Sequence, residues 1–210
     1  SSVGPYTLAY LLATKSGDFL LYKDAVYTYL HLQYNGFFTL AVFSLLLHKL
    51  YKSVPAKGQK QLYRFSVTLC LSILPSVFLS YLWQYPNAIL RIIAIAGVLL
   101  MLLSLVWFLR IIPYIRQHFI AVIPFSRYIA ILAMTAFVLK VLLQSGTIFP
   151  AIGDLVFGDR PVIIGFLHLV FLGFVTLFVL WDLAVIGMLT AWSRLTRWAV
   201  NAFTWSVVAN

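Results

Sequence analysis

Two histidines in matching surroundings are the residues of this chain best suited to chemistry. His31 lies in YLHLQYNGFFTLAVF, residues 29–43, and His168 lies in FLHLVFLGFVTLFVL, residues 166–180. The two segments match without gaps at 8 of 15 positions, and the matches include a histidine, a glycine and a threonine. Such a match in register indicates an internal repeat. Neutral imidazole is a good ligand for haem iron or copper, so the pair predicts a haem or metal site.

The neighbours of each histidine indicate which way it points. On a helix, His31 shares its face with polar and aromatic residues, namely Tyr27, Thr28, Tyr34, Asn35 and Phe38. Polar groups in hydrocarbon need partners, so we expect this face to point into a bundle, with Tyr34, Asn35 or Gln33 orienting the ring. His168 has an apolar face that includes Gly165, which suits a large flat ligand such as haem. The alternative is a pair of buried histidines that hydrogen-bond across helices.

Two further ionisable residues lie inside apolar segments. We expect Lys140 either to snorkel to the interface or to be a counter-ion for Asp154, Asp159 or haem propionates. Asp182 is expected either to form a salt bridge with Arg194 or Arg197, or to be an entry point on a proton path.

The amino-acid composition indicates that these residues lie in a membrane protein. Of the 210 residues, 63% are hydrophobic and 10% are charged, against about 25% charged in an ordinary soluble domain. These values exclude a soluble enzyme and a disordered chain, and the single Cys70 excludes a disulfide scaffold. The net charge of +10 comes from basic residues between apolar runs, which indicates membrane topology and no nucleic-acid partner.

The apolar runs predict the fold: an all-α, polytopic transmembrane helix bundle with five spans and a four-helix repeat. A span needs roughly 20 apolar residues, and the runs are about Ala25–Leu47, Phe65–Trp83, Ala88–Ile112, Ser126–Leu143 and Pro161–Met188. Pro75 is expected to kink the second span. Pro5–Thr14 is expected to be the tail of an earlier helix or an interfacial helix. Trp192–Val208 is expected to be an amphipathic surface helix or a truncated sixth span.

The basic residues predict the orientation. One side of the membrane holds 10 of the 15, which are Lys49, Lys52, Lys57, Lys60, Arg64, Arg110, Arg116, Arg127, Arg194 and Arg197. That side is predicted to be cytoplasmic, in an inner (plasma) membrane. Spans one and five then run in the same direction, and His31 and His168 lie at one depth, about 10 Å inside the outer face. Gly36 and Gly173 are expected to permit close helix crossing.

A resemblance adds to these inferences. The pattern H-L-x-x-L-G-F-V-T at His168–Thr176 resembles that of NnrS-type membrane proteins, which are linked to nitric oxide metabolism. Histidine-bearing helices four spans apart resemble haem-copper oxidase subunit I. Tyr29–Gly36 and the later segment are similar to an uncharacterised Bacteroidetes-type membrane family. The resemblance implies that residues 1–210 are one transmembrane domain, the C-terminal half of a longer protein. The chain has no H-x-H or His-His pair, so the resemblance does not extend to oxygen reduction.

The sequence thus predicts a membrane protein that binds haem, copper or iron near its outer side, in a respiratory or nitric oxide-related setting. Its site residues are His31, His168, Tyr34, Asn35 and Lys140. Its partners are the lipid bilayer and other membrane subunits or an N-terminal half. One alternative is a cofactor-free structural subunit, which predicts histidines bonded to protein groups. The other is a small-molecule or ion transporter with a water-filled cavity at Lys140 or Asp182. Enzymatic activity is left open.

Overall fold

The computed structural model describes residues 2–85, 87–120, 124–188 and 193–209, without the side chains of residues 118–126. Throughout these ranges the chain is helical or forms turns, with no β-strand. Five helices are long and apolar enough to cross a membrane: Phe19–Tyr51, Ala56–Ser80, Ala88–Gln117, Arg127–Gly146 and Arg160–Val185. The predicted all-helical, multi-pass membrane protein is therefore confirmed at this level, and we call the five helices spans one to five.

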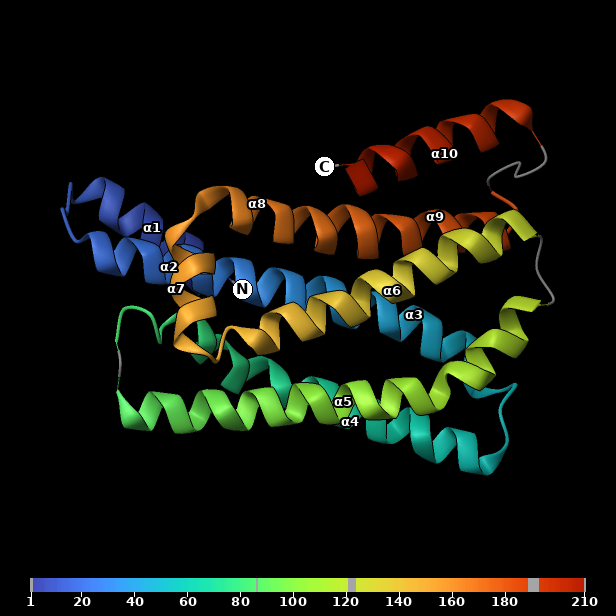
Figure 1. Ribbon diagram of the computed structural model, residues 1–210, viewed down its shortest axis with the longest axis horizontal. Helices are drawn as coiled ribbons and strands as arrows, with labels where there is room; N and C mark the ends of the chain where they lie inside the picture. Colours follow the sequence, from blue (N-terminus) through green and yellow to red (C-terminus); the bar gives the residue numbers. More distant parts are fainter. Residues whose placement is uncertain (1, 86, 121–123, 189–192, 210) are drawn as a thin grey trace.

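Spans one and five are each built from three consecutive helices (Figure 1). Span one consists of α2 (Phe19–His31), the π-helix η1 (Leu32–Phe38) and α3 (Thr39–Tyr51). Span five consists of α8 (Arg160–His168), the π-helix η3 (Leu169–Thr176) and α9 (Leu177–Val185). Each histidine is thus the last α-helical residue before a π-helical segment.

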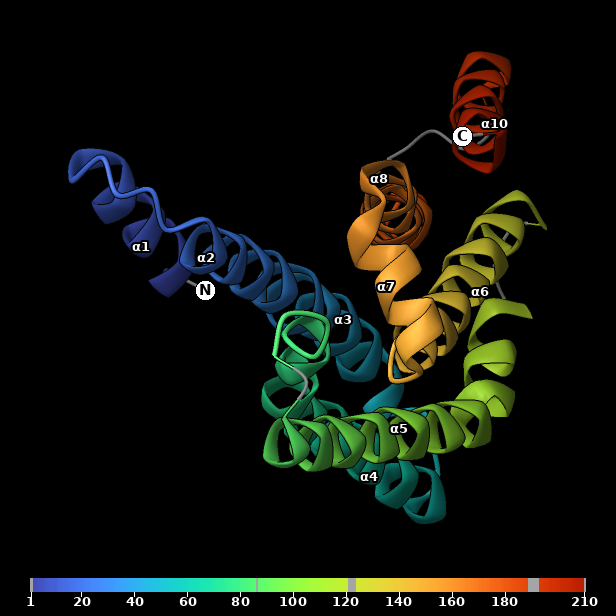
Figure 2. The ribbon, with the colours of Figure 1, turned by 60° about the vertical axis from the view of Figure 1, so that its left-hand side comes forward.

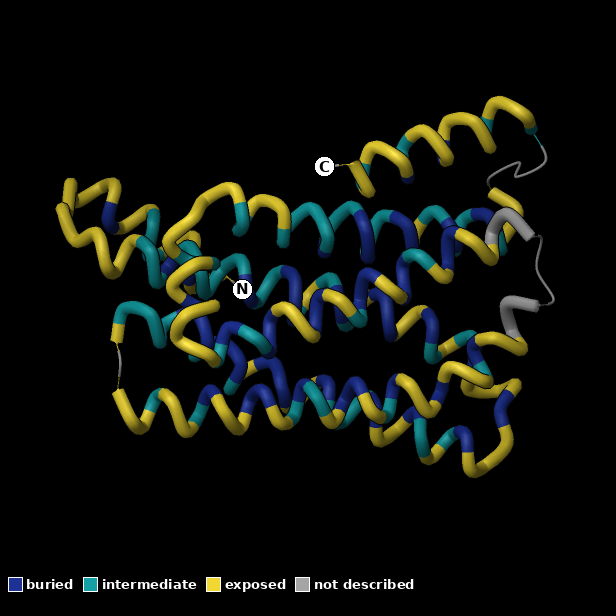
Figure 3. The backbone as a smooth tube through the Cα atoms, in the orientation of Figure 1, coloured by how far each residue is buried: buried dark blue, intermediate teal, exposed yellow. Residues whose placement is uncertain are grey.

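The other spans are simpler. Span two is α4 (Ala56–Val77) with the 3₁₀ turn η2 (Phe78–Ser80), and spans three and four lie in α5 (Ala88–Ile120) and α6 (Pro124–Gly146). Three shorter helices complete the chain and are largely exposed (Figure 3): α1 (Val3–Ala13), α7 (Pro150–Gly158) and α10 (Arg194–Ala209).

The helix boundaries differ from the predicted ones by several residues, most of all at the start of α4 and the end of α5. The α4 helix begins at Ala56 rather than Phe65, because its basic first turns are helical although they are too polar for the apolar run. The α5 helix continues through Pro113 instead of ending at Ile112. A proline inside a helix removes one backbone hydrogen bond and bends the helix, and α5 bends in its last third (Figure 1).

The flanking segments pack against spans one and five. The α1 helix runs antiparallel to α2 and contacts it. The α10 helix runs back along η3, and its buried residues are Val200 and Thr204. Trp192, the predicted first residue of that segment, lies outside the described residues.

The α4 and α5 helices approach each other closely at Gly97. A Cβ atom built on Gly97 would lie 2.6 Å from the Ser76 nitrogen, so only glycine fits there. The sequence had instead suggested Gly36 and Gly173. A Cβ on Gly173 would meet Ala136 at 3.4 Å, and one on Gly36 would find nothing nearer than 3.9 Å. These are ordinary contacts, so the prediction of close crossing at Gly36 is wrong.

One phenylalanine from each span forms the centre of the core. The five are Phe43, Phe65, Phe108, Phe137 and Phe174, and each is at most 1% exposed. Their ring centroids approach to 4.6 Å for Phe43 and Phe137 and to 4.8 Å for Phe43 and Phe65. Each favourable aromatic pair is worth about 0.5–1.5 kcal/mol beyond the area it buries. This phenylalanine cluster fixes the relative positions of all five spans.

Beyond the cluster, spans one and five separate. They contact each other through η1 and η3. From there α2 and α8 run apart toward the end of the bundle that holds α7 and the turn Tyr81–Tyr85, which we call the α7 end (Figure 2). At the opposite end Lys49 of α3 forms an ion pair with Asp182 of α9. The two helices are therefore joined at one end and parted at the other.

Candidate functional site

The two histidine segments have the same local hydrogen bonds. Thr39 donates its hydroxyl to the carbonyl of Tyr34, and Thr176 donates to that of Phe171. Both bonds span five residues, the spacing of a π-helix, and the four residues occupy corresponding positions of the two segments. π-Helical turns are rare in proteins, and a large share of those that occur lie at functional sites. Both segments are therefore candidates for a functional site.

His31 is fully enclosed, as its polar face predicted. It is 1% exposed, and its Nε2 donates to the carbonyl oxygen of Ile73 at 3.0 Å, with the Ser76 hydroxyl 3.2 Å away. Asn35 Nδ2 lies 3.2 Å from Nδ1 and donates to it. Because a carbonyl only accepts, the proton sits on Nε2, and the remaining lone pair on Nδ1 is used by Asn35. Neither ring nitrogen presents a lone pair to a metal.

His168 has different surroundings. It is half-buried at the end of α8, and its interactions lie within the protein. Among the described residues, no group of three or more histidine, cysteine or acidic side chains is arranged to hold a metal ion. The haem or metal site of His31 and His168 therefore stays a prediction, and the observed bonds of His31 do not fit ligation.

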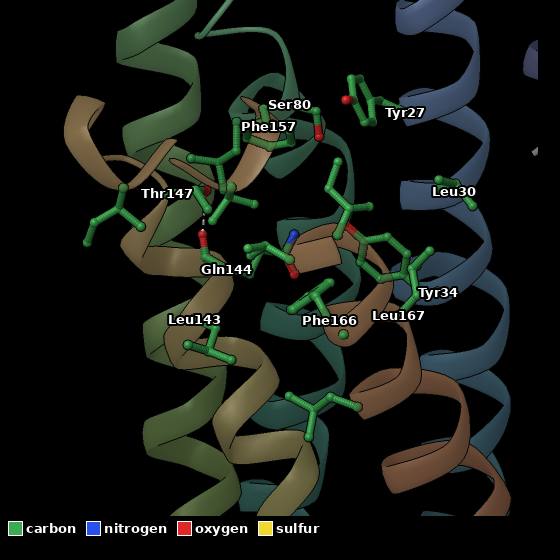
Figure 4. A pocket seen from close by; sticks show the side chains of 17 residues that line it. Tyr27, Leu30, Tyr34, Ser80, Leu143, Gln144, Thr147, Phe157, Phe166 and Leu167 are labelled. Atoms are coloured by element: carbon green, nitrogen blue, oxygen red, sulfur yellow. Dashed lines mark hydrogen bonds between the residues drawn. The ribbon is translucent and has the colours of Figure 1, made fainter. Parts of the chain in front are cut away.

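A cavity of about 210 Å³ lies where α2 and α8 diverge (Figure 4). Its walls come from span one (Tyr27, Leu30 and Tyr34), α8 (Phe166 and Leu167) and α7 (Phe157), and Gln144 of α6 lines it too. Spans one and five both contribute to the wall of this cavity. The histidines do not line it, because His31 points toward α4.

Gln144 is one of the few polar residues that line this mostly apolar cavity, together with Ser80 and Thr147. It is 6% exposed, and its side-chain amide points into the cavity toward Tyr34 (Figure 4). Its Oε1 atom has no hydrogen-bond partner among the described residues. A buried acceptor without a partner costs about 1–3 kcal/mol, so a ligand that donates a hydrogen bond here would be stabilised by that amount.

Lys140 lies one helical turn from Gln144 and is 2% exposed, so it does not snorkel to the interface. Its Nζ donates to the Thr39 hydroxyl at 3.3 Å and lies 5.8 Å from the centroid of the Tyr34 ring. It makes no ion pair within the described part of the chain, and Asp154 and Asp159, its expected partners, are both exposed.

Asp182 pairs with Lys49 of span one rather than with Arg194 or Arg197. The Lys49 ammonium also lies 5.5 Å from the centroid of the Trp181 ring. The expected salt bridge exists, but its partner was wrong, because tertiary packing brings α3 and not the α10 region to Asp182. The role of Asp182 in a proton path stays a prediction.

A second cavity of about 560 Å³ adjoins the first at the α7 end. It is more polar and is lined by Asn87, Arg91 and Asp154. Three residues line both cavities, and they are Leu79, Thr147 and Phe157. The two cavities therefore share part of one wall, with the second nearer the α7 end.

Phe157 stands between the cavities. Its ring stacks on Trp83 at 6.3 Å with an interplanar angle of 12° and meets the Tyr27 ring edge-on at 5.4 Å. The sequence alone did not single out this residue or the helix that carries it. That helix is α7, which begins with Pro150 in the first turn, where a proline is well tolerated.

Hydrogen bonds hold the turn Tyr81–Tyr85 against α2. The carboxylate of Asp24 accepts from Gln84 Nε2 at 2.6 Å and from the Tyr85 hydroxyl at 3.3 Å. The hydroxyls of Thr28 and Tyr81 are bonded to each other. Burial raises the pKa of Tyr81, so this hydroxyl stays protonated at neutral pH. These bonds keep the wall formed by α2 in place.

No protein-family model, curated protein or solved structure matches this chain. The resemblance to haem-copper oxidase subunit I and to NnrS-type proteins therefore depends on the sequence motifs alone.

Proposed function

We propose that this protein binds a small lipophilic molecule in the cavity between α2 and α8. The observation that carries the proposal is the Gln144 amide, which is buried, lacks a partner for its Oε1 atom and is aimed into a mostly apolar space. Ligand pockets in proteins are mostly apolar with a few polar groups that fix orientation, and this cavity has that character.

The cavity volume limits the size of the ligand. A dry cavity of about 150 Å³ in another protein takes up benzene. A volume of about 210 Å³ therefore suits one substituted ring. The ring would pack against the aromatic walls formed by Tyr27, Tyr34 and Phe166, and a hydroxyl on it would donate to Gln144 Oε1. Entry is from the α7 end, past Phe157.

Binding of phenol and toluene to the purified protein in lipid nanodiscs tests this function. Protein-free nanodiscs serve as the blank for partitioning into lipid. We expect phenol to bind more tightly than toluene, because only phenol can donate a hydrogen bond to Gln144. The Gln144→Leu substitution should reduce that preference about tenfold, since it removes one buried hydrogen bond. Gln61→Leu is the matched control, since Gln61 Oε1 is also buried without a partner but lies on α4, outside the cavity lining. Absence of saturable binding of either ring would contradict the proposal.

We also propose that residues 29–43 and 166–180 are copies of one repeat. The corresponding π-helices and threonine bonds support this. The predicted orientation then puts the cavity in the outer half of an inner membrane, with the Lys49 end cytoplasmic. Cysteine accessibility in intact cells tests the orientation, with a cysteine at the exposed Lys57 expected to be protected from an impermeant reagent.

Haem binding is a second candidate, favoured by the position of both histidines at the start of a π-helix. His31 would first have to leave Ile73 or Asn35. A Soret band in the purified protein that is lost in His168→Ala would support a haem. The bonds of His31 to protein groups instead favour the cofactor-free structural subunit. The transporter alternative has less support, since neither Lys140 nor Asp182 lines either cavity.

A further inference from the structure

A groove between α5 and α6 combines two positive charges with an apolar lining. Its volume is about 270 Å³, and the side chains of Arg116 and Arg127 line it. Apart from the hydroxyl of Thr135, the rest of its lining is apolar and consists of Phe108, Ile112, Ile115, Ile131, Met134 and Val138. Phe108 is fully buried, whereas Ile131 is 51% exposed. The groove therefore has a closed floor and opens on the side of the bundle that faces lipid.

The span boundaries give the depth of each part of the groove. Span three ends at Gln117 and span four begins at Arg127, so both arginines lie where these helices leave the membrane on one side. From there the groove reaches Phe108 of α5 and Val138 of α6, about 12 Å and about 16 Å farther along the two helices. The charged end thus lies at the level of the lipid headgroups, and the apolar part lies at the level of the acyl chains.

The protein supplies no counter-charge for the two guanidinium groups in the part that the structure describes. The chain has five acidic residues, and Asp182 is the one at this end of the bundle, where it is paired with Lys49. The other four lie in or beside α2 and α7, at the α7 end, and they are Asp18, Asp24, Asp154 and Asp159. Arg127 also lies in the first turn of α6, where the helix dipole disfavours a cation and favours an anion. The charged end of the groove is therefore suited to an external anion.

We propose that this groove binds an anionic phospholipid, with its phosphate at Arg116 and Arg127 and one acyl chain along the apolar lining. The planar guanidinium group matches phosphate oxygens in geometry and charge. A neutral lipid offers no net negative charge to the arginines, and free phosphate leaves the apolar lining uncovered. Each basic residue near the surface strengthens binding of anionic lipid about fivefold, so two contribute about thirtyfold. This site is separate from the cavity at Gln144 and does not depend on its ligand.

Native mass spectrometry of the purified protein in detergent micelles tests the proposal. Titrations with phosphatidylglycerol and with phosphatidylcholine of the same acyl chains give the affinity of the first bound lipid in each case. We expect the natural chain to bind phosphatidylglycerol at least about tenfold more tightly. The double variant Arg116→Gln, Arg127→Gln should lower this ratio to about one. Equal affinities of the natural chain for the two lipids would overturn the proposal.

The matched control is the double variant Arg64→Gln, Arg110→Gln. These two arginines are also exposed, and each lies 4.7 Å from the centroid of the Trp107 ring, outside the groove lining. The preference for phosphatidylglycerol should not change in this variant. An equal loss in the control would show a general attraction of basic residues and would overturn the proposal.

Two further variants separate the charge from the shape of the groove. Arg116→Lys with Arg127→Lys keeps both charges and should keep most of the preference. Ile131→Trp keeps both arginines but fills the open side of the groove, and it should weaken binding of phosphatidylglycerol about tenfold. Unchanged binding in Ile131→Trp, or displacement of the lipid by millimolar glycerol phosphate, would show that the acyl chain does not use the groove and would overturn the proposal.

Discussion

The two histidine segments have the same backbone and different surroundings. Each histidine ends an α-helix, each is followed by a π-helix, and each threonine bonds the carbonyl five residues earlier. Yet His31 is sealed against α4 with both ring nitrogens bonded, whereas His168 is half-buried. The difference teaches that the local sequence sets the helix type, while the neighbouring helix decides what a histidine does.

The same contrast explains the cavity. Span one meets α4 and α6, and its polar inner face is satisfied by Ile73 and Ser76 of α4 and by Lys140 of α6. The α8 part of span five has no buried residue, and it borders the cavity instead. The cavity thus forms where two similar helices lose contact with each other.

The largest loss of stability in a comparison of the two histidine segments is expected for His31→Ala. It removes the bonds of the ring to the Ile73 carbonyl and to the Asn35 amide and leaves a cavity beside α4, so we expect the protein to lose about 3–4 kcal/mol of stability. His168→Ala should cost about 1 kcal/mol, because that side chain is half-buried. Equilibrium unfolding in mixed micelles measures both. Equal losses would show that the two histidines have equivalent surroundings after all.

The matched threonines come next. Thr39→Val removes the bond to Tyr34 and the acceptor of the Lys140 ammonium, and should cost about 2 kcal/mol. Thr176→Val removes only the bond to Phe171 and should cost about 1 kcal/mol. The same unfolding assay ranks them. A larger loss for Thr176→Val would mean that Lys140 does not depend on Thr39.

A third prediction concerns the cavity without touching either histidine. Gly165 lines the cavity, and a Cβ added there meets nothing within 4 Å. We expect Gly165→Phe to fill the space and weaken phenol binding about tenfold, about 1.4 kcal/mol, with stability little changed. Gly36→Phe is the control, because Gly36 lies outside this cavity with nothing nearer than 3.9 Å. Unchanged phenol binding in Gly165→Phe would place the ligand elsewhere.

The smallest effect is expected at the other end of the same two spans. Lys49→Met breaks the ion pair with Asp182. The side chain of Lys49 is 22% exposed and that of Asp182 is 16% exposed. Since water screens such a pair, the loss should be about 1 kcal/mol or less. Asp182→Asn should behave alike, and the double variant should show whether the two losses are coupled. A loss above that of Thr39→Val would make this ion pair the main tie between spans one and five.

Much of the architecture was predictable from periodicity and composition. The five spans and the inward face of His31 follow from local patterns. The path of α5 through Pro113 was not predictable, because whether a proline bends or ends a helix depends on what packs around it. The helix α7 and the position of Phe157 were also not predictable from the sequence. A glycine-containing segment between two spans has too little apolar periodicity to specify its structure.

The candidate site divides in the same way. The sequence alone determined the apolar spans, their basic flanks and the paired segments around His31 and His168, because these depend on residue type and spacing along one helix. Only the tertiary structure decided that His31 bonds to Ile73, that Lys140 is enclosed and that Gln144 faces a cavity. Those facts depend on which helices contact each other and which helices move apart. Contacts between residues distant in the sequence are not encoded in the pattern of any single helix.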